Sequence, residues 1–364
     1  MLPILPGVYA LPLVQESEVI ISTPNKVYMV GLRGTGGSGT DNVVTVVNSI
    51  ADFEVKFGTS SPSLPDVTLY FANTSDVLHF VSVVLTVPND AAQHLDFSTS
   101  FDVLPETGSG VLVCPAAYNI NDSDIDYDAL TVLLSQTQAR TGLTVFIDIP
   151  AGLNVADTVT FIQGVRPLDN MAVFYPALTV ASNPVMPSSA MAALTIKAIA
   201  LGGIATSAAG SAHPIKGATL TDISNTQWES LFEIGVNVLR NRRGSVIAMG
   251  CRTLSANRAF INTSMIINSI RESLLENSDP LLFQASDNQG QVYNLGQGIA
   301  SRVMMTFFEA RALVGLTPRD AFQVICDSSN NSAADRAAGI LNITVILQPA
   351  SAVERVFITP RISL

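Results

Sequence analysis

The chain has 364 residues, 48% hydrophobic and only 13% charged, so it is long enough for two or three domains with buried cores. Its net charge of −11 is uneven: residues 1–180 hold 5 Lys and Arg against 18 Asp and Glu, and residues 181–364 hold 14 against 12. An acidic chain without a basic, aromatic-rich stripe argues against nucleic-acid binding, and an aromatic content of 7% disfavours a large ligand cavity.

Two segments could be mistaken for targeting or membrane signals. Residues 1–13 carry no charge and contain three prolines, so they have no basic region followed by an apolar helix, as a secretory signal would. Residues 188–210 are apolar over a membrane-spanning length, but Lys197 and the pair Gly202 and Gly203 interrupt them. We therefore expect a buried helix followed by a small-residue loop, and no membrane insertion.

The first half of the chain alternates strands with helices, which is typical of a parallel sheet covered on both faces. Residues 1–19 precede it as an extended arm, because prolines prevent a regular helix there. Residues 66–73 fit a helix or a strand, and the polar stretch 88–110 is expected to be a loop or a boundary. Strands are expected at residues 26–32, 42–47, 77–87, 111–114, 143–149 and 171–175, and helices at 49–54, 126–140 and 155–163.

The second half has an α+β pattern and ends in an apolar strand, residues 353–364, with no evident partner in its own fold. Open strand edges are templates for pairing with another chain, so we expect the protein to work by association with copies of itself. Helices are expected at residues 188–200, 228–234, 263–276 and 295–314, and strands at 245–249, 322–326, 341–347 and after 349. The fold class is thus α/β plus α+β, with a mixed sheet in an outer α/β domain (20–235, sub-boundary at 88–110), a C-terminal α+β domain (236–348), and arms at 1–19 and 349–364.

A glycine-rich loop, residues 34–39, satisfies the pattern G-x-G-x-x-G after a predicted strand. A dinucleotide site needs a helix immediately after the glycines, with its N-terminus on the pyrophosphate. Here a β-branched run, residues 43–47, follows, and no phosphate-binding lysine is present. A flexible hairpin loop is therefore favoured, and a nucleotide-binding α/β enzyme that uses Gly34 to Gly39 is kept as the alternative of another class.

Metal, cofactor and catalytic signals are weak. Four aspartates alternate in residues 122–128, but the glycine and glutamate that an EF-hand requires are missing, so a solvated acidic loop is favoured. The histidines lack metal-ligand spacing: His79, His94 and His213. The cysteines lie far apart in apolar runs and are expected to be buried free thiols: Cys114, Cys251 and Cys326. The only basic cluster fits a solvated turn: Arg240, Arg242 and Arg243. We expect no catalytic residue, cofactor or metal.

Several distinctive blocks occupy the last 130 residues: 234–239 (IGVNVL), 249–255 (MGCRTLS), 260–262 with 269–274, 312–322 (ALVGLTPRDAF), 326–327 and 353–358 (VERVFI). Shorter blocks stand upstream in a consistent order: 6–9 (PGVY), 49–53 with 57–58, 175–176 and 187–190. Together they resemble the sheath proteins of contractile phage tails and related injection machines, and MGCRTLS is the most specific of them. Residues 197–200 depart from the family's usual turn, and the shortness of 88–110 indicates a small sheath.

This resemblance implies a structural subunit that polymerises helically, as hexameric rings, around a tail tube and contracts to drive the tube through a target envelope. The implied partners are further copies of the chain, the tube protein, and the baseplate and tail terminator proteins. The implied location is the virion, after synthesis in the host cytoplasm; a bacterial contractile injection system or a tailocin is the alternative.

The resemblance also assigns roles to the arms, which would pair with strands of neighbouring subunits and keep them linked while rigid domains turn. The expected inter-subunit residues are Pro6, Gly7, Val8, Tyr9, Val353, Val356, Phe357 and Ile358. The expected tube-facing residues are Arg302, Arg311 and Arg319, with the acidic N-terminal half facing outward.

Overall fold

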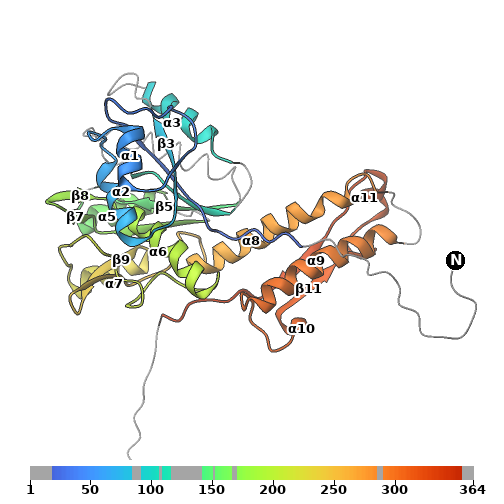
Figure 1. The fold of residues 1–364 in the computed structure, drawn as a ribbon. Helices are drawn as coiled ribbons and strands as arrows, with labels where there is room; N and C mark the ends of the chain where they lie inside the picture. The colour runs from blue at the N-terminus through green and yellow to red at the C-terminus, as the bar shows by residue number, and fades with distance from the viewer. Residues whose placement is uncertain are drawn as a thin grey trace, which may run out of the picture.

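A computed structural model describes residues 19–83, 92–105, 109–115, 142–150, 152–165, 170–284 and 290–354. Its centre is an eight-stranded sheet with the strand order β10-β9-β6-β5-β4-β1-β3-β2 (Figure 1). The strands are β1 (Val27–Leu32), β2 (Thr45–Val47), β3 (Leu78–Val83), β4 (Gly110–Val113), β5 (Leu143–Asp148), β6 (Met171–Tyr175), β9 (Asn237–Arg242) and β10 (Ser245–Ala248).

The sheet is mixed, as expected. Its inner strands β3, β1, β4, β5, β6 and β9 pair in parallel, whereas the edge strands β2 and β10 are antiparallel to their neighbours. β9 joins β6 through Phe174 opposite Asn237, so the sheet runs across the boundary that was expected between residues 235 and 236. Arg243 and Gly244, both with positive φ, form the two-residue turn between β9 and β10, while Arg240 lies within the strand.

Both faces of the sheet are buried, because successive side chains of a strand point to opposite faces. On β1, Val27 and Met29 belong to one apolar cluster, and Tyr28 and Val30 belong to the other. The helices around the sheet are α1 (Ile50–Phe57), α2 (Leu64–Asn73), α3 (Ala92–Asp102), α5 (Val155–Val165), α6 (Pro187–Gly202) and α7 (Asn225–Glu233). A short hairpin, β7 (Leu178–Val180) and β8 (Asn183–Val185), precedes α6.

The apolar helix α6 is the buried helix that the sequence predicted. It packs on α2 and against β1, β4, β5 and β6, and its small alanine and serine side chains permit this close approach. Lys197 reaches the helix surface and donates from Nζ to the carbonyl of Asn73, 3.2 Å away. No helix in the described ranges is both long and apolar enough to cross a membrane.

Three expectations from the sequence were wrong or incomplete. A helix, α3, lies in the stretch 88–110 that was expected to be a loop, because Phe97 and Phe101 are one turn apart and fully buried against the sheet. β2 pairs with β3 and not with β1, so residues 34–39 do not form a hairpin. β9 was not predicted as a strand. The expected helix 126–140 and the acidic loop 122–128 lie outside the described residues.

The C-terminal part extends from the sheet as a separate layer of two long helices and a small sheet (Figure 1). Its elements are α8 (Ile261–Ser278), η2 (Asp279–Leu281), α9 (Gln291–Glu309), α10 (Pro318–Ala321), β11 (Phe322–Ile325), α11 (Ala333–Ala337) and β12 (Thr344–Leu347). α8 packs on α9, and β11 and β12 form an antiparallel pair against α9. Ile270, Val303 and Phe307 are buried between these elements and form part of their apolar core.

Candidate assembly site

The segments that lead to the two expected arms are bound to different parts of the fold, the N-terminal one to α8 and the C-terminal one to Arg252. Ile20 exchanges two hydrogen bonds with the amide of Asn277 on α8, N to Oδ1 at 3.1 Å and Nδ2 to O at 2.7 Å. Ser22 donates its N–H to Ser273 Oγ, 2.9 Å away on the same helix. The N-terminal segment is therefore bound along α8. The expected arm residues Pro6, Gly7, Val8 and Tyr9 lie outside the described residues.

The C-terminal strap, defined here as residues 348–354, returns from β12 to the large sheet (Figure 1). Gln348 donates its N–H to the carbonyl of Ala321 and accepts from Val314, at 3.0 and 2.8 Å. Ala350 donates to Ala312 at 2.8 Å, and its carbonyl accepts from Thr263 Oγ1 at 3.0 Å. The first half of the strap is thus bound to the C-terminal part before the chain reaches the sheet.

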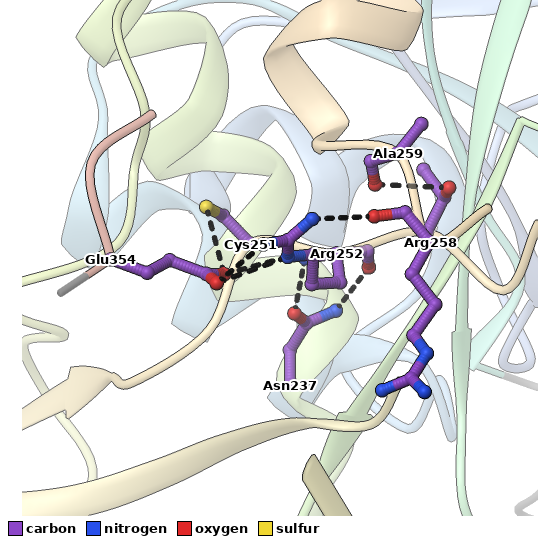
Figure 2. Close-up of polar contacts among 7 residues, drawn as sticks. Asn237, Cys251, Arg252, Arg258, Ala259 and Glu354 are labelled. Atoms are coloured by element: carbon purple, nitrogen blue, oxygen red, sulfur yellow. Dashed lines mark hydrogen bonds and ion pairs between the residues drawn. The ribbon is translucent and has the colours of Figure 1, made fainter. Parts of the chain in front are cut away.

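Glu354 holds the second half of the strap on the sheet through Arg252 (Figure 2). Arg252 donates from Nε to both carboxylate oxygens at 3.0 Å and from Nη2 to Oε2 at 2.7 Å. The same guanidinium donates from Nη1 to the carbonyl of Arg258 at 2.7 Å and lies 3.7 Å above the ring centre of Phe260. The side chains of Arg252 and Glu354 are only 27% and 14% exposed, so this ion pair is stronger than an ordinary surface pair.

Asn237 fixes the backbone that carries Arg252. This fully buried residue of β9 donates from Nδ2 to the carbonyls of Val173 and Arg252, at 3.0 and 2.7 Å, and accepts the Arg252 N–H at 2.6 Å. A Cβ on Gly250 would lie 2.9 Å from Asn237 Oδ1, so the close approach favours glycine there. The block 249–255 is therefore a rigid extension of the sheet.

Cys251, beside the ion pair, has no nucleophilic character. Its Sγ lies 3.9 Å from Glu354 Oε1, and burial raises the pKa of the thiol to about 11, so it is neutral at physiological pH. All three cysteines are buried and belong to no disulfide, as expected. In the part of the chain that the structure describes, no group of His, Cys, Asp and Glu side chains is placed to hold a metal ion.

Two hollows flank the Arg252–Glu354 pair. One, of about 590 Å³, is lined by apolar groups that include Trp228, Phe232 and Val353, and the other, of about 470 Å³, lies beside Arg258 and Phe260. Glu354 and Phe232 border both. Among the inter-subunit residues expected in the C-terminal arm, the structure describes Val353, which is 81% exposed next to the larger hollow. Val356, Phe357 and Ile358 lie beyond the described residues.

The expected tube-facing arginines occupy successive elements of the C-terminal part. Arg302 is half-buried on α9, Arg311 is exposed just after α9 with a φ of +58°, and Arg319 is exposed in α10. Within the described ranges none of the three guanidinium groups has an ion-pair partner. Their positive charge is therefore available to an acidic surface.

The glycine loop is not arranged to bind a phosphate. The N–H groups of Gly34, Ser38 and Gly39 donate to the carbonyls of Phe57, Val55 and Lys56, at 2.7, 3.2 and 2.7 Å. These carbonyls form the negative end of α1, which repels an anion. The loop is therefore a packed contact and not a flexible hairpin, and this packing disfavours the nucleotide-binding alternative.

No protein-family model matches the sequence, and no curated protein does either. The structure is similar to a chain in the baseplate of the anti-feeding prophage (AFP), with a TM-score of 0.76, 16% identity and 100% of each chain covered. It is similar to the sheath complex of PVC, an extracellular contractile injection system, in the contracted state: TM-score 0.75, 18% identity, 99% of this chain and 98% of that chain covered. A sheath tail protein from Desulfitobacterium hafniense gives a TM-score of 0.64 at 10% identity, covering 98% and 100%. Over its whole length the chain has the fold of the sheath proteins of contractile tails and injection systems.

Proposed function

We propose that the chain is the structural subunit of a contractile sheath, which polymerises helically around a tail tube and contracts to drive the tube through a target envelope. The observation that carries this proposal is the likeness, over 99% of the chain, to sheath chains such as that of contracted PVC. A further AFP sheath chain in the contracted state matches in the same way, with a TM-score of 0.75 and 100% of this chain covered.

The small sheet of β11 and β12 supports strand exchange between subunits. Among the described residues it has two strands only, and a two-stranded sheet is marginally stable in water. On β12, Val345 and Leu347 pack toward the core of the C-terminal part, while Ile346 is 53% exposed. Strands supplied by neighbouring subunits, from residues 6–9 and 353–358, would extend this sheet on its open edges and bury its outer face.

The charge distribution supports an orientation in the sheath. The acidic half, residues 1–180, would face outward, and Arg302, Arg311 and Arg319 would face the tube. The further partners would be the baseplate and tail terminator proteins, and the likeness to a chain of the AFP baseplate structure supports a place next to a baseplate. The particle would be a virion assembled from subunits made in the host cytoplasm. The higher TM-scores to AFP and PVC chains favour the alternative, an injection system or tailocin.

Assembly of the purified protein tests this function. Negative-stain microscopy should show tubes or rings for the full chain, whereas a chain that ends at Val353 should remain a folded monomer by circular dichroism and size-exclusion chromatography. Replacement of Val356, Phe357 and Ile358 with serine should have the same effect as truncation. The matched control is Leu201→Ser, which removes an apolar side chain that is 74% exposed outside the arms and should leave assembly intact. Normal tubes from the truncated chain would contradict strand exchange.

A further inference from the structure

We infer that the Arg252–Glu354 pair is a positioning device that sets where the C-terminal arm begins and in which direction it leaves the subunit. This inference rests on the proposed sheath function and gives a role to two blocks, 249–255 and 353–358, that the fold alone leaves unexplained. The two residues are separated by 102 positions in the chain, yet their side chains meet at 2.7 Å.

The contacts of Arg252 make it a rigid anchor. Its backbone is bound by Asn237, its guanidinium stacks on Phe260, and its Nη1 is committed to the carbonyl of Arg258. Nε and Nη2 therefore point toward a single place, where the carboxylate of Glu354 accepts from both (Figure 2). An arginine held in this way selects a carboxylate in one orientation, because its donors form a planar fork.

Without this pair the arm would begin earlier. Ala350 is the last strap residue whose backbone is bound to the C-terminal part, through Ala312 and Thr263. Residues 351–354 would then be held only by the packing of Ala352, and their release would lengthen the arm by up to about 13 Å. A longer arm searches a larger volume, so its effective concentration at a neighbouring strand falls. Each additional residue must also be ordered when the arm pairs with a neighbour, which disfavours assembly.

The charged groups around Glu354 are consistent with a single partner. Besides Arg252, the hollows beside it contain Arg258, whose side chain points away from the pair, and Glu229 of α7. The neutral thiol of Cys251 completes the surroundings of the carboxylate. Among the residues that the structure describes here, Arg252 is therefore the cation on which Glu354 depends.

Proteolysis of the unassembled chain tests the positioning step without requiring a sheath. Trypsin cleaves after Arg355, directly beyond Glu354, so the contact of Glu354 with Arg252 must open before the protease can bind the chain there. The release rate of the peptide that begins at Val356 is measured for wild type, Glu354→Ala and Arg252→Gln. Division by the rate in a synthetic peptide of residues 350–364 carrying the same residue at 354 removes the direct effect of that side chain on trypsin.

We expect the resulting protection to fall about tenfold in both variants, which corresponds to about 1.4 kcal/mol. Asp222→Asn, which breaks the ion pair of Arg240 with Asp222, is the matched control and should keep wild-type protection. Circular dichroism and the melting temperature show that each variant is folded. Protection within twofold of wild type in both Glu354→Ala and Arg252→Gln overturns the inference.

The second measurement is the lowest protein concentration at which tubes form. It should rise about tenfold in Glu354→Ala and stay unchanged in Asp222→Asn. Lost protection with an unchanged threshold overturns the positioning role while the sheath function stands. A wild-type chain that forms no tubes at any concentration overturns the sheath function. It also overturns the assembly role inferred for the pair, even if Glu354→Ala and Arg252→Gln lose protection against trypsin.

Discussion

Replacement of Asp148 with asparagine should remove a pH dependence of folding that this buried carboxyl group imposes. Asp148 ends β5 and is fully buried at the N-terminus of α6, where Ser188 donates its N–H to Oδ1 at 2.9 Å and its hydroxyl to Oδ2. Burial raises the pKa of Asp148 to about 7, and the two hydrogen bonds from Ser188 act in the opposite direction.

The sign follows from proton linkage. The folded chain holds a proton on Asp148 up to about pH 7, whereas the unfolded chain loses it near the ordinary value of 3.8. Between these values the native state binds more protons, so the free energy of unfolding falls as the pH rises. Between pH 5 and pH 8 the loss is about 3 kcal/mol. The positive N-terminal end of the α6 helix dipole favours the charged carboxylate and therefore lowers the expected loss of unfolding free energy. The loss should still be at least about 1 kcal/mol.

Urea unfolding at pH 5, 6, 7 and 8 measures the effect. Asparagine can accept from the N–H of Ser188 and donate to its hydroxyl, but it does not titrate in this range. The free energy of unfolding of Asp148→Asn should therefore increase by about 1 to 3 kcal/mol relative to wild type from pH 5 to pH 8. Asp157→Asn, on the exposed side of α5, is the control and should follow wild type. Equal pH slopes in Asp148→Asn and wild type would refute a carboxyl that is protonated in the native state.

Three further predictions concern the rest of the fold. Asn237→Ala leaves three buried backbone groups without their partner and should lower the free energy of unfolding by about 3 kcal/mol, measured by urea denaturation; a loss below about 1 kcal/mol would contradict the anchoring role. Gly37→Ala would place a Cβ 2.3 Å from the carbonyl oxygen of Lys56 and should lower the free energy of unfolding by at least about 3 kcal/mol. Gly36→Ala would place its Cβ in open space at a φ of +83° and should lower it by about 1 kcal/mol. A larger drop in melting temperature for Gly36→Ala than for Gly37→Ala would contradict the packed loop. Isothermal titration with ATP or NAD should give no saturable heat, and micromolar binding would contradict the assignment of the loop amides to α1.

The buried elements of the fold were the predictable ones. β4, β5, β6 and α6 consist mostly of apolar residues, and local pattern alone places such segments in a core. The start of α1 follows an ordinary sequence rule, because Ser49 is the N-cap and its Oγ accepts from the Asp52 N–H.

The failures have a common cause in tertiary packing. α3 is polar except for a few positions, so its two buried phenylalanines did not stand out from a loop. β9 ends in two polar residues, Asn241 and Arg242, so its sequence does not show the pattern of a strand. Pairing with β6 stabilises it as one. The glycine loop matches a phosphate-binding pattern, but three of its N–H groups donate to carbonyls at the C-terminal end of α1. The pattern contains no information about this second segment.

The candidate site was predictable only in its parts. The sequence resemblance marked the blocks that contain Arg252 and Glu354, but a contact across 102 positions leaves no local pattern from which to infer it. The buried asparagine gave no signal either, since Asn237 is a polar residue at the start of an unpredicted strand.

The positions of the two bound segments bear on how a sheath could stay connected while it contracts. The N-terminal segment is held on α8, and the strap ends on the large sheet at Arg252. A pull on a C-terminal arm is therefore borne by an eight-stranded sheet with two buried faces, and a pull on an N-terminal arm is borne by the α8 and α9 layer. Each is a packed body that resists deformation, so in the proposed sheath the change on contraction would lie in the angle between subunits. Under this mechanism Asn277, which binds Ile20, should contribute to assembly as Glu354 does. Asn277→Ala should therefore weaken assembly without unfolding the chain. If Asn277→Ala forms tubes like wild type, only the C-terminal anchor contributes to assembly.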